Sequence, residues 1–247
     1  MEIQIQNACP NCNQDITDNF CSNCGIPTHL EKIDKNYALK EFTSLFGFEK
    51  GFLYTIKELL LRPGETTQTY LSKNRHKYTK PLTFLLATSA LYTLLVHYLH
   101  AESVLIEKMA KTNQHLHGQS GLQWMQDNYG YANILSGIFT AYFLKKFFKK
   151  YNYNFYEIAV HLFFVTGEGM IILLLMPINT KYLHSVWIES LLSVFAYLYI
   201  AWALGQFFEK KFSSYVKAFI AYILGLLVFG IILAIIGAVY ELILERT

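Results

Sequence analysis

The amino-acid sequence predicts an all-α membrane protein: a five-helix transmembrane bundle preceded by amphipathic helices and a small cysteine-containing module. Hydrophobic residues make up 53% of the 247 residues and charged residues only 16%, against roughly 25% charged residues in a typical soluble domain. Residues 1–80 are polar and charged, whereas residues 81–247 are mostly apolar and their charges gather into short clusters. This contrast places a boundary near Pro81.

Two CxxC pairs occupy residues 1–30, as Cys9-Pro-Asn-Cys12 and Cys21-Ser-Asn-Cys24-Gly25. Each pair can form a tight turn that points two thiolates at one tetrahedral ion about 2.3 Å away, and Gly25 permits the positive φ that such turns need. The first long apolar run starts only at Leu82, so we expect no signal peptide and a reducing cytosol, which disfavours disulfides. We therefore predict a zinc ribbon, with iron as the alternative metal. Four cysteines fill the coordination sphere, so the zinc is structural.

Residues 31–80 carry two short amphipathic segments. Apolar residues recur at helical spacing in 37–46 and again in 52–61, where Arg62-Pro63-Gly64 ends the second helix. Neither segment reaches the ~20 apolar residues that a membrane span requires. We expect interfacial amphipathic helices that lie on the cytosolic leaflet or against the bundle.

A basic segment follows these helices and stands directly before the first predicted span. It contains Lys73, Arg75, Lys77 and Lys80. Attraction to anionic lipid headgroups, at about 1 kcal/mol per cation, accounts for this composition. A nucleic-acid patch is the alternative, but the position beside the membrane favours lipid headgroup contact.

Five apolar stretches in 81–247 are long enough to cross ~30 Å of hydrocarbon as helices. They are residues 82–100, 130–148, 156–178, 184–208 and 215–241. The second stretch has the weakest pattern, because Asn133, Ser136 and Gly137 dilute it and Lys145 comes early.

The placement of lysine and arginine predicts the orientation of the bundle, since these residues gather on the cytoplasmic side. With five spans, four of the 21 cations fall on one side (Lys108, Lys111, Lys181 and Arg246) and the remaining 17 on the other. We therefore expect a cytoplasmic N-terminus, and with it the ribbon, and an external C-terminus.

Acidic and histidine side chains within the spans are candidates for function, because ionisable groups are costly at this depth. The third stretch carries Glu157, His161 and Glu168 on one helical face, and glycines flank Glu168. Glu189 in the fourth stretch can reach a similar depth. These groups can bind a cation or relay protons. Alternatively they lock helices together, and we favour this interpretation for His161 and Glu189. Glu157 is close to the cytosolic end, where it can simply be interfacial.

Five of the eight histidines fall on the predicted outer side, where they can bind a metal or respond to pH. They are His97, His100, His115, His117 and His184. No spacing among them forces the side chains to converge, so we favour no bound metal.

Several motifs in residues 9–90 resemble a known family. They are CxxC…CxxCG at 9–25, Phe48 to Thr55, Leu59 to Gly64, Tyr70-Leu71, and Arg75 to Tyr78 before Lys80-Pro81. This pattern is similar to the bacterial zinc-ribbon membrane proteins grouped as domain of unknown function 3667. The resemblance implies a zinc ribbon, several spans and the bacterial inner membrane, and it implies no activity.

From the sequence we expect a non-enzymatic integral membrane protein whose cytosolic zinc ribbon recruits or senses a partner, such as a cytosolic protein or a nucleic-acid-bound one. It would be an accessory or effector protein acting on the membrane. The alternative is a small, oligomeric channel or transporter that uses the intramembrane Glu/His pathway. HExxH, Gly-x-Ser-x-Gly and paired intramembrane aspartates do not occur in the sequence, so an intramembrane enzyme is the least favoured reading.

Overall fold

The structure, a computed structural model, describes residues 3–4, 9, 11–15, 19–25, 29–30, 51–101, 121, 124–125 and 128–244. The chain forms two compact units, Met1–Phe46 and Gly47–Thr247. The predicted helix at 37–46 and the histidines His115 and His117 lie outside the described residues.

The N-terminal unit contains two short strands, β1 (Ile3–Gln4) and β2 (His29–Leu30). They pair in antiparallel register, with Ile3 opposite Leu30. The segment that carries the four cysteines lies between these strands in the chain, so the strand pair closes the cysteine segment at its base.

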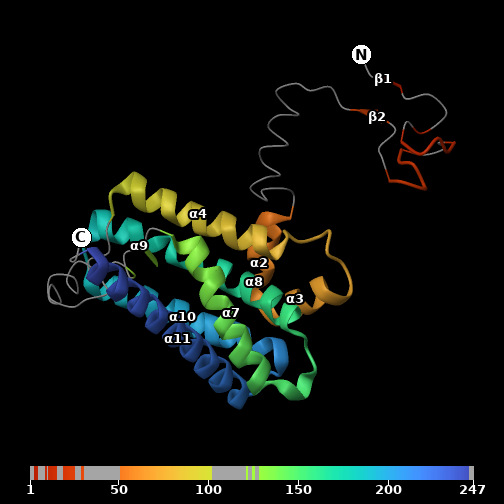
Figure 1. The fold of residues 1–247 in the computed structure, drawn as a ribbon. Helices are drawn as coiled ribbons and strands as arrows, with labels where there is room; N and C mark the ends of the chain where they lie inside the picture. Colours follow the sequence, from red (N-terminus) through yellow and green to blue (C-terminus); the bar gives the residue numbers. More distant parts are fainter. Residues whose placement is uncertain are drawn as a thin grey trace. The chain divides into compact units, whose positions relative to one another are not determined.

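The second unit is a bundle of long helices, and each predicted apolar stretch forms one of them (Figure 1). These helices are α4 (Pro81–Leu99), α7 (Tyr129–Phe147), α8 (Phe155–Leu173), α10 (Val186–Phe208) and α11 (Phe212–Leu244). Among the described residues, four helical segments are long and apolar enough to cross a membrane: α4, Phe155–Leu183, α10 and α11. This is consistent with a multi-pass membrane protein.

Helix α7 is not one of the four apolar helices. Asn133 lies in its first half and Lys145 and Lys146 lie in its last turn, which lowers its apolar content although its length equals that of α4. The helix nonetheless packs along α11 and α8. A fifth span therefore stays a prediction, to which we return below.

The span that begins with α8 is not one regular helix. It continues through α9 (Leu175–Ile178) into a π-helical turn, η2 (Asn179–Leu183), and ends at His184 in a left-handed conformation. Pro177 explains the interruption after Leu173, because proline has no N–H to donate to the carbonyl four residues before it.

Two shorter helices, α2 (Phe52–Leu61) and α3 (Pro63–Ser72), pack against α8, and α3 also packs against α10 (Figure 1). Of the two placements expected for residues 52–61, the structure has the one against the bundle. The second compact unit accordingly begins at Gly47, well before the composition boundary at Pro81. Helix α3 was not predicted, because its sequence is polar and its threonines Thr66 and Thr67 are nevertheless buried.

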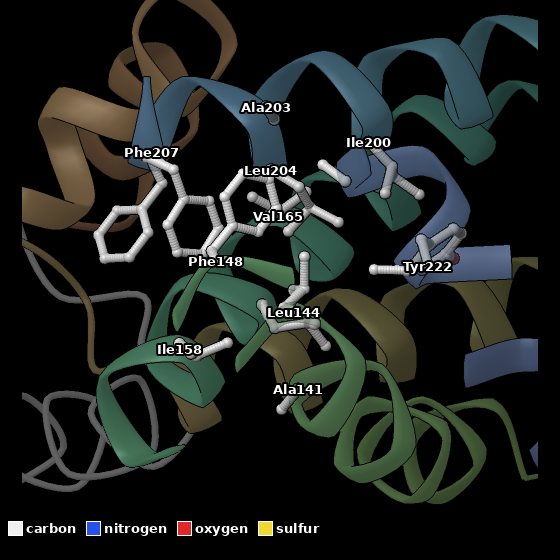
Figure 2. Packing of buried hydrophobic residues seen from close by; sticks show 14 of the residues in the cluster. Ala141, Leu144, Phe148, Ile158, Val165, Ile200, Ala203, Leu204, Phe207 and Tyr222 are labelled. Atoms are coloured by element: carbon white, nitrogen blue, oxygen red, sulfur yellow. The ribbon is translucent and has the colours of Figure 1, made fainter. Parts of the chain in front are cut away.

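The main core lies between α7, α8, α10 and α11. Figure 2 shows Leu144 of α7, and Phe148 directly after that helix, pointing toward Leu204 and Phe207 of α10. Phe148 also stacks face to face on Phe208, with ring centroids 3.9 Å apart. A smaller cluster joins α2, α4 and α8 and is made of Phe52, Leu59, Tyr78, Phe84, Ala87 and Phe164. The short helices thus share a core with the spans.

Candidate metal centre and buried polar contacts

The four cysteines come together as the spacing predicts. One ligand atom from each of Cys9, Cys12, Cys21 and Cys24 lies within 4.8 Å of the others, and all four are free thiols. The sulfurs of Cys9 and Cys24 are 3.4 Å apart and those of Cys12 and Cys21 are 3.6 Å apart. A tetrahedral ion with sulfur ligands at about 2.3 Å keeps them about 3.8 Å apart, so the geometry fits a single bound metal ion.

Each CxxC pair is held by the same backbone turn. The N–H of Asn13 donates to Cys9 O and the N–H of Gly25 donates to Cys21 O, both at 2.9 Å. The residue after each pair is left-handed, with φ of 58° at Asn13 and 72° at Gly25. The positive φ expected at Gly25 is confirmed. Asn13 occupies the same position after the first pair. Its residue type is a sequence signal for this turn, because asparagine tolerates the left-handed conformation better than most residues.

The backbone of these turns also favours the thiolate form that binds metals. Hydrogen bonds from Asn11 and then Cys12 lower the pKa of Cys9 to about 6. Similar bonds from Cys24 and Asn23 lower the pKa of Cys21. Four thiolates arranged around one point are the donor set of a structural metal site, and they leave no coordination position for a substrate.

The turn between α2 and α3 is held by Arg62, which ends the first helix and precedes the second. Its guanidinium contacts both carboxylate oxygens of buried Glu58, at 2.8 and 3.1 Å. Arg62 lowers the pKa of Glu58, mainly through this hydrogen bond. Pro63 then occupies the first position of α3, where its missing N–H costs nothing. The Arg62-Pro63-Gly64 pattern therefore forms a turn between two packed helices.

His161 of α8 is fully buried and joins three helices. Its Nδ1 lies 2.8 Å from Thr67 Oγ1 of α3, and its Nε2 lies 3.2 Å from the carbonyl oxygen of Ala203 in α10. A carbonyl only accepts, so Nε2 carries the proton of the neutral ring, and Nδ1 is an acceptor that shares the single Thr67 hydroxyl proton with Pro63 O, 3.1 Å from Thr67 Oγ1. The ring stacks on Phe207, with centroids 4.4 Å apart. These contacts join α8 to α3 and α10.

Glu168 lies further along α8 and differs from His161. Its side chain is 0% exposed, and within the described part of the chain neither carboxyl oxygen has a hydrogen-bond partner. The flanking glycines allow neighbouring helices to approach closely: a Cβ on Gly167 would meet the ring of Phe84 in α4, and a Cβ on Gly169 would meet Ile200 of α10.

The other two acidic candidates sit at helix starts. Glu157 forms a capping box with Asn154, since each side chain accepts a hydrogen bond from the other residue's backbone N–H at 2.8 and 2.9 Å. Glu189 is buried in the first turn of α10. Among the described residues the four cysteines are the only group of three or more metal-ligating side chains. Glu157, His161, Glu168 and Glu189 therefore do not form one metal site.

The basic segment between α3 and α4 exposes Lys73, Arg75, Lys77 and Lys80. Arg75 lies over the ring of Tyr70 and Lys77 over that of Tyr54, 5.9 and 4.5 Å from the centroids. The backbone of this segment is anchored, because Thr79 N–H donates to buried Thr55 Oγ1 at 3.0 Å. Its cations are thus presented outward from a fixed loop.

Three of the histidines predicted for the outer side are described by the structure, and all three are exposed: His97, His100 and His184. They belong to no group of metal-ligating side chains within the described residues. His100 and His184 instead end helices in left-handed conformations.

An ionic cluster ties together the turns at the opposite end of the bundle. Glu209 contacts Lys211, Tyr151 and Lys150, and these contacts lower its pKa to about 2, with Lys211 as the largest cause. Lys210 pairs with Glu65 of α3 at 2.6 Å. No local sequence pattern indicates this cluster, because Glu65, Lys150 and Glu209 are far apart in the chain.

Residues 49–93 match the model of a family described as "Protein of unknown function (DUF3667)". This match confirms the resemblance. It covers α2, α3, the basic segment and most of α4, and the cysteines at 9–24 are consistent with the same family. No similar curated protein and no similar solved structure was found. The DUF3667 description carries no activity, so function is argued from the sites.

Proposed function

We propose that this protein is a non-enzymatic, multi-pass membrane protein whose cytosolic zinc ribbon recruits or senses a partner. The observation that carries the proposal is the four-cysteine centre, which is self-contained within Met1–Phe46. A closed thiolate site supplies folding energy to a unit too small to build a core, and it offers no chemistry. Binding is the function left to such a unit.

An exposed aromatic side chain supports a docking role for the ribbon. Phe20, directly before Cys21, is 62% exposed. Large aromatic residues on a small polar module are typical anchors of protein interfaces. We propose a cytosolic protein, free or bound to nucleic acid, as the occupant of this surface.

Zinc binding and recruitment can be tested on the full-length protein. Metal analysis of the purified chain should give one zinc per chain, and Cys12→Ser should abolish it, whereas Ser22→Ala, a change in the same module at an exposed position, should not. A photo-crosslinking residue at position 20 should then capture a partner in cells in the Ser22→Ala background and not in the Cys12→Ser background. Nuclease treatment distinguishes a protein partner from a nucleic-acid-bound one. Equal capture in both backgrounds contradicts recruitment by the ribbon.

We further propose five spans, with α7 as the fifth, in the bacterial inner membrane. Three features support α7 as a span: Tyr131 is exposed at its first turn, apolar Leu135 and Ile138 are exposed along it, and lysines end it. Exposed aromatic residues also mark the ends of other helices, as expected at membrane interfaces: Tyr98, Tyr156, Trp187 and Phe212.

The number of spans determines where the C-terminus lies. With a cytosolic N-terminus, five spans place residue 247 outside and four spans place it in the cytosol. An alkaline phosphatase fusion at the C-terminus should therefore be active, because this enzyme folds only where disulfides form. A C-terminal fluorescent protein that fails on the external side serves as the reciprocal control. An inactive phosphatase fusion contradicts five spans.

The buried carboxyl of Glu168 favours one second candidate, a small oligomeric channel or transporter. In proteoliposomes, Glu168→Gln should abolish ion flux under this hypothesis, whereas Cys12→Ser should leave it intact. Flux that is unchanged by Glu168→Gln eliminates the pathway through α8.

A further inference from the structure

Glu168 occupies a sealed position between three helices. Its carboxyl is buried on α8, with Phe84 of α4 packed against Gly167 on one side and Ile200 of α10 against Gly169 on the other. A carboxylate without hydrogen-bond donors is strongly disfavoured in such surroundings. Some species must neutralise it.

A proton fits this position better than a metal cation. Hard cations take about six oxygen ligands, and the described residues place no group of three ligating side chains around Glu168. The other charged groups on the elements that pack around Glu168 are paired, distant or exposed. Glu58 pairs with Arg62 and Glu65 pairs with Lys210. His161 lies about 10 Å away along α8, His97 lies at the far end of α4, and Lys145 and Lys146 are exposed.

Tyr199 of α10 is the group that connects Glu168 with α2. It lies close enough to Glu168 for an electrostatic interaction, and its hydroxyl donates to the carbonyl oxygen of Leu59 at 3.1 Å. That carbonyl is one of the last four of α2, which have no partner within the helix. Tyr199 therefore caps the C-terminal turn of α2, and its single proton can serve only one acceptor at a time.

We propose that Glu168 is a proton-binding site whose occupancy controls the docking of α2. While Glu168 holds its proton, Tyr199 donates to Leu59 O. When the proton passes to bulk water, the carboxylate takes the hydrogen bond of Tyr199, because a charge-assisted bond is roughly twice as strong as a neutral one. The last turn of α2 then loses its cap. This proposal depends neither on the zinc ribbon nor on ion conduction.

Infrared titration of the full chain in nanodiscs tests the proton site directly. A protonated carboxyl has a C=O stretch distinct from that of a carboxylate. We expect such a band in the wild type near neutral pH, its loss at alkaline pH, and its absence from Glu168→Gln. Glu189→Gln, which removes another buried carboxyl, should keep the band. A spectrum that is the same in wild type and Glu168→Gln overturns the proposal.

Hydrogen exchange tests the coupling to α2. After correction for the intrinsic effect of pH, amides in the last turn of α2 should exchange about fivefold faster once Glu168 is deprotonated, as expected for loss of one net hydrogen bond. Glu168→Gln should remove this pH dependence and Glu189→Gln should keep it. Tyr199→Phe should exchange fast at every pH. If the pH dependence survives in Glu168→Gln or Tyr199→Phe, the coupling is refuted. Should Glu168→Gln fail to fold, the wild-type titration and Tyr199→Phe still decide.

Discussion

Replacing Gly64 with alanine probes whether α3 is docked on α10 as the structure shows. A Cβ at this position would lie 2.6 Å from the carbonyl carbon and oxygen of Gln206 and 2.8 Å from the nitrogen of Phe207. These are backbone atoms, so no side-chain rotation can relieve the overlap. Because ordinary contact starts at 3.4 Å, the two helices must separate by up to about 0.8 Å. Overpacking of this kind costs about 1–3 kcal/mol.

Gly230→Ala is the matched control. A Cβ on Gly230 meets nothing within 4 Å, although Gly230 also lies in a helix. In a helix, alanine adds up to about 1 kcal/mol of stability over glycine. Both variants share this gain, which is at most equal at Gly64 because Gly64 lies in the first turn of α3. A stability difference beyond about 1 kcal/mol therefore reports the overlap with α10.

Reversible unfolding in mixed detergent micelles measures this difference. We expect Gly64→Ala to be less stable than Gly230→Ala by about 1–3 kcal/mol, and Gly230→Ala to equal or exceed the wild type. If Gly64→Ala is as stable as Gly230→Ala, α3 is not packed on α10 at this distance.

Chelation of zinc should unfold the N-terminal unit and leave the helical bundle folded, and Cys12→Ser should have the same effect, as judged by circular dichroism and limited proteolysis. Lysine and tyrosine partners hold the pKa of Glu209 at about 2, below its value of about 4.5 in the unfolded chain. The stability that Glu209 contributes is therefore present above about pH 4.5 and is lost as the pH falls toward 2. In unfolding titrations, Glu209→Gln should lack this loss of stability. Thr67→Val should cost about 1–3 kcal/mol, because it leaves a buried nitrogen of His161 unpaired, whereas Thr69→Val should be near neutral in the same unfolding assay.

The long helices were predictable because a span needs only length and apolar content. Their limits match closely: the stretch predicted at 82–100 is the helix Pro81–Leu99. The convergence of the cysteines was predictable for a different reason, since CxxC spacing and a glycine after the second pair dictate a local turn. Both inferences depend on neighbours in the chain.

The docking of α2 and α3 was not predictable from local pattern. Thr66 and Thr67 make α3 look like a solvated loop, yet the hydroxyl of Thr66 donates to Glu58 O and that of Thr67 lies within hydrogen-bond distance of Pro63 O and His161 Nδ1. A buried hydroxyl with its partners supplied costs little. Proline at the start of α3 was the available signal for a new helix.

The partners of Glu157, His161 and Glu168 likewise could not be predicted from the sequence. All three share one face of α8, but their partners come from elsewhere: a cap at Asn154, a threonine on α3, and no hydrogen-bond donor at Glu168 among the described residues. Helical periodicity gives the face and cannot give the partner. The three side chains therefore share a helical face and differ in their partners.

The family match covers a segment whose turns and close contacts require particular residues. Residues 49–93 contain turns that only certain residues can make, such as the close packing of Gly51 against the backbone of Lys77 and Tyr78. The helices that receive this segment, α8 and α10, need mainly apolar volume, which many sequences supply. The matched segment meets α8 and α10 at His161 and Tyr199, and Tyr199 interacts electrostatically with Glu168. The tightest packing of this segment is therefore found where α2 and α3 meet α8 and α10, and Tyr199, which caps α2, belongs to that contact.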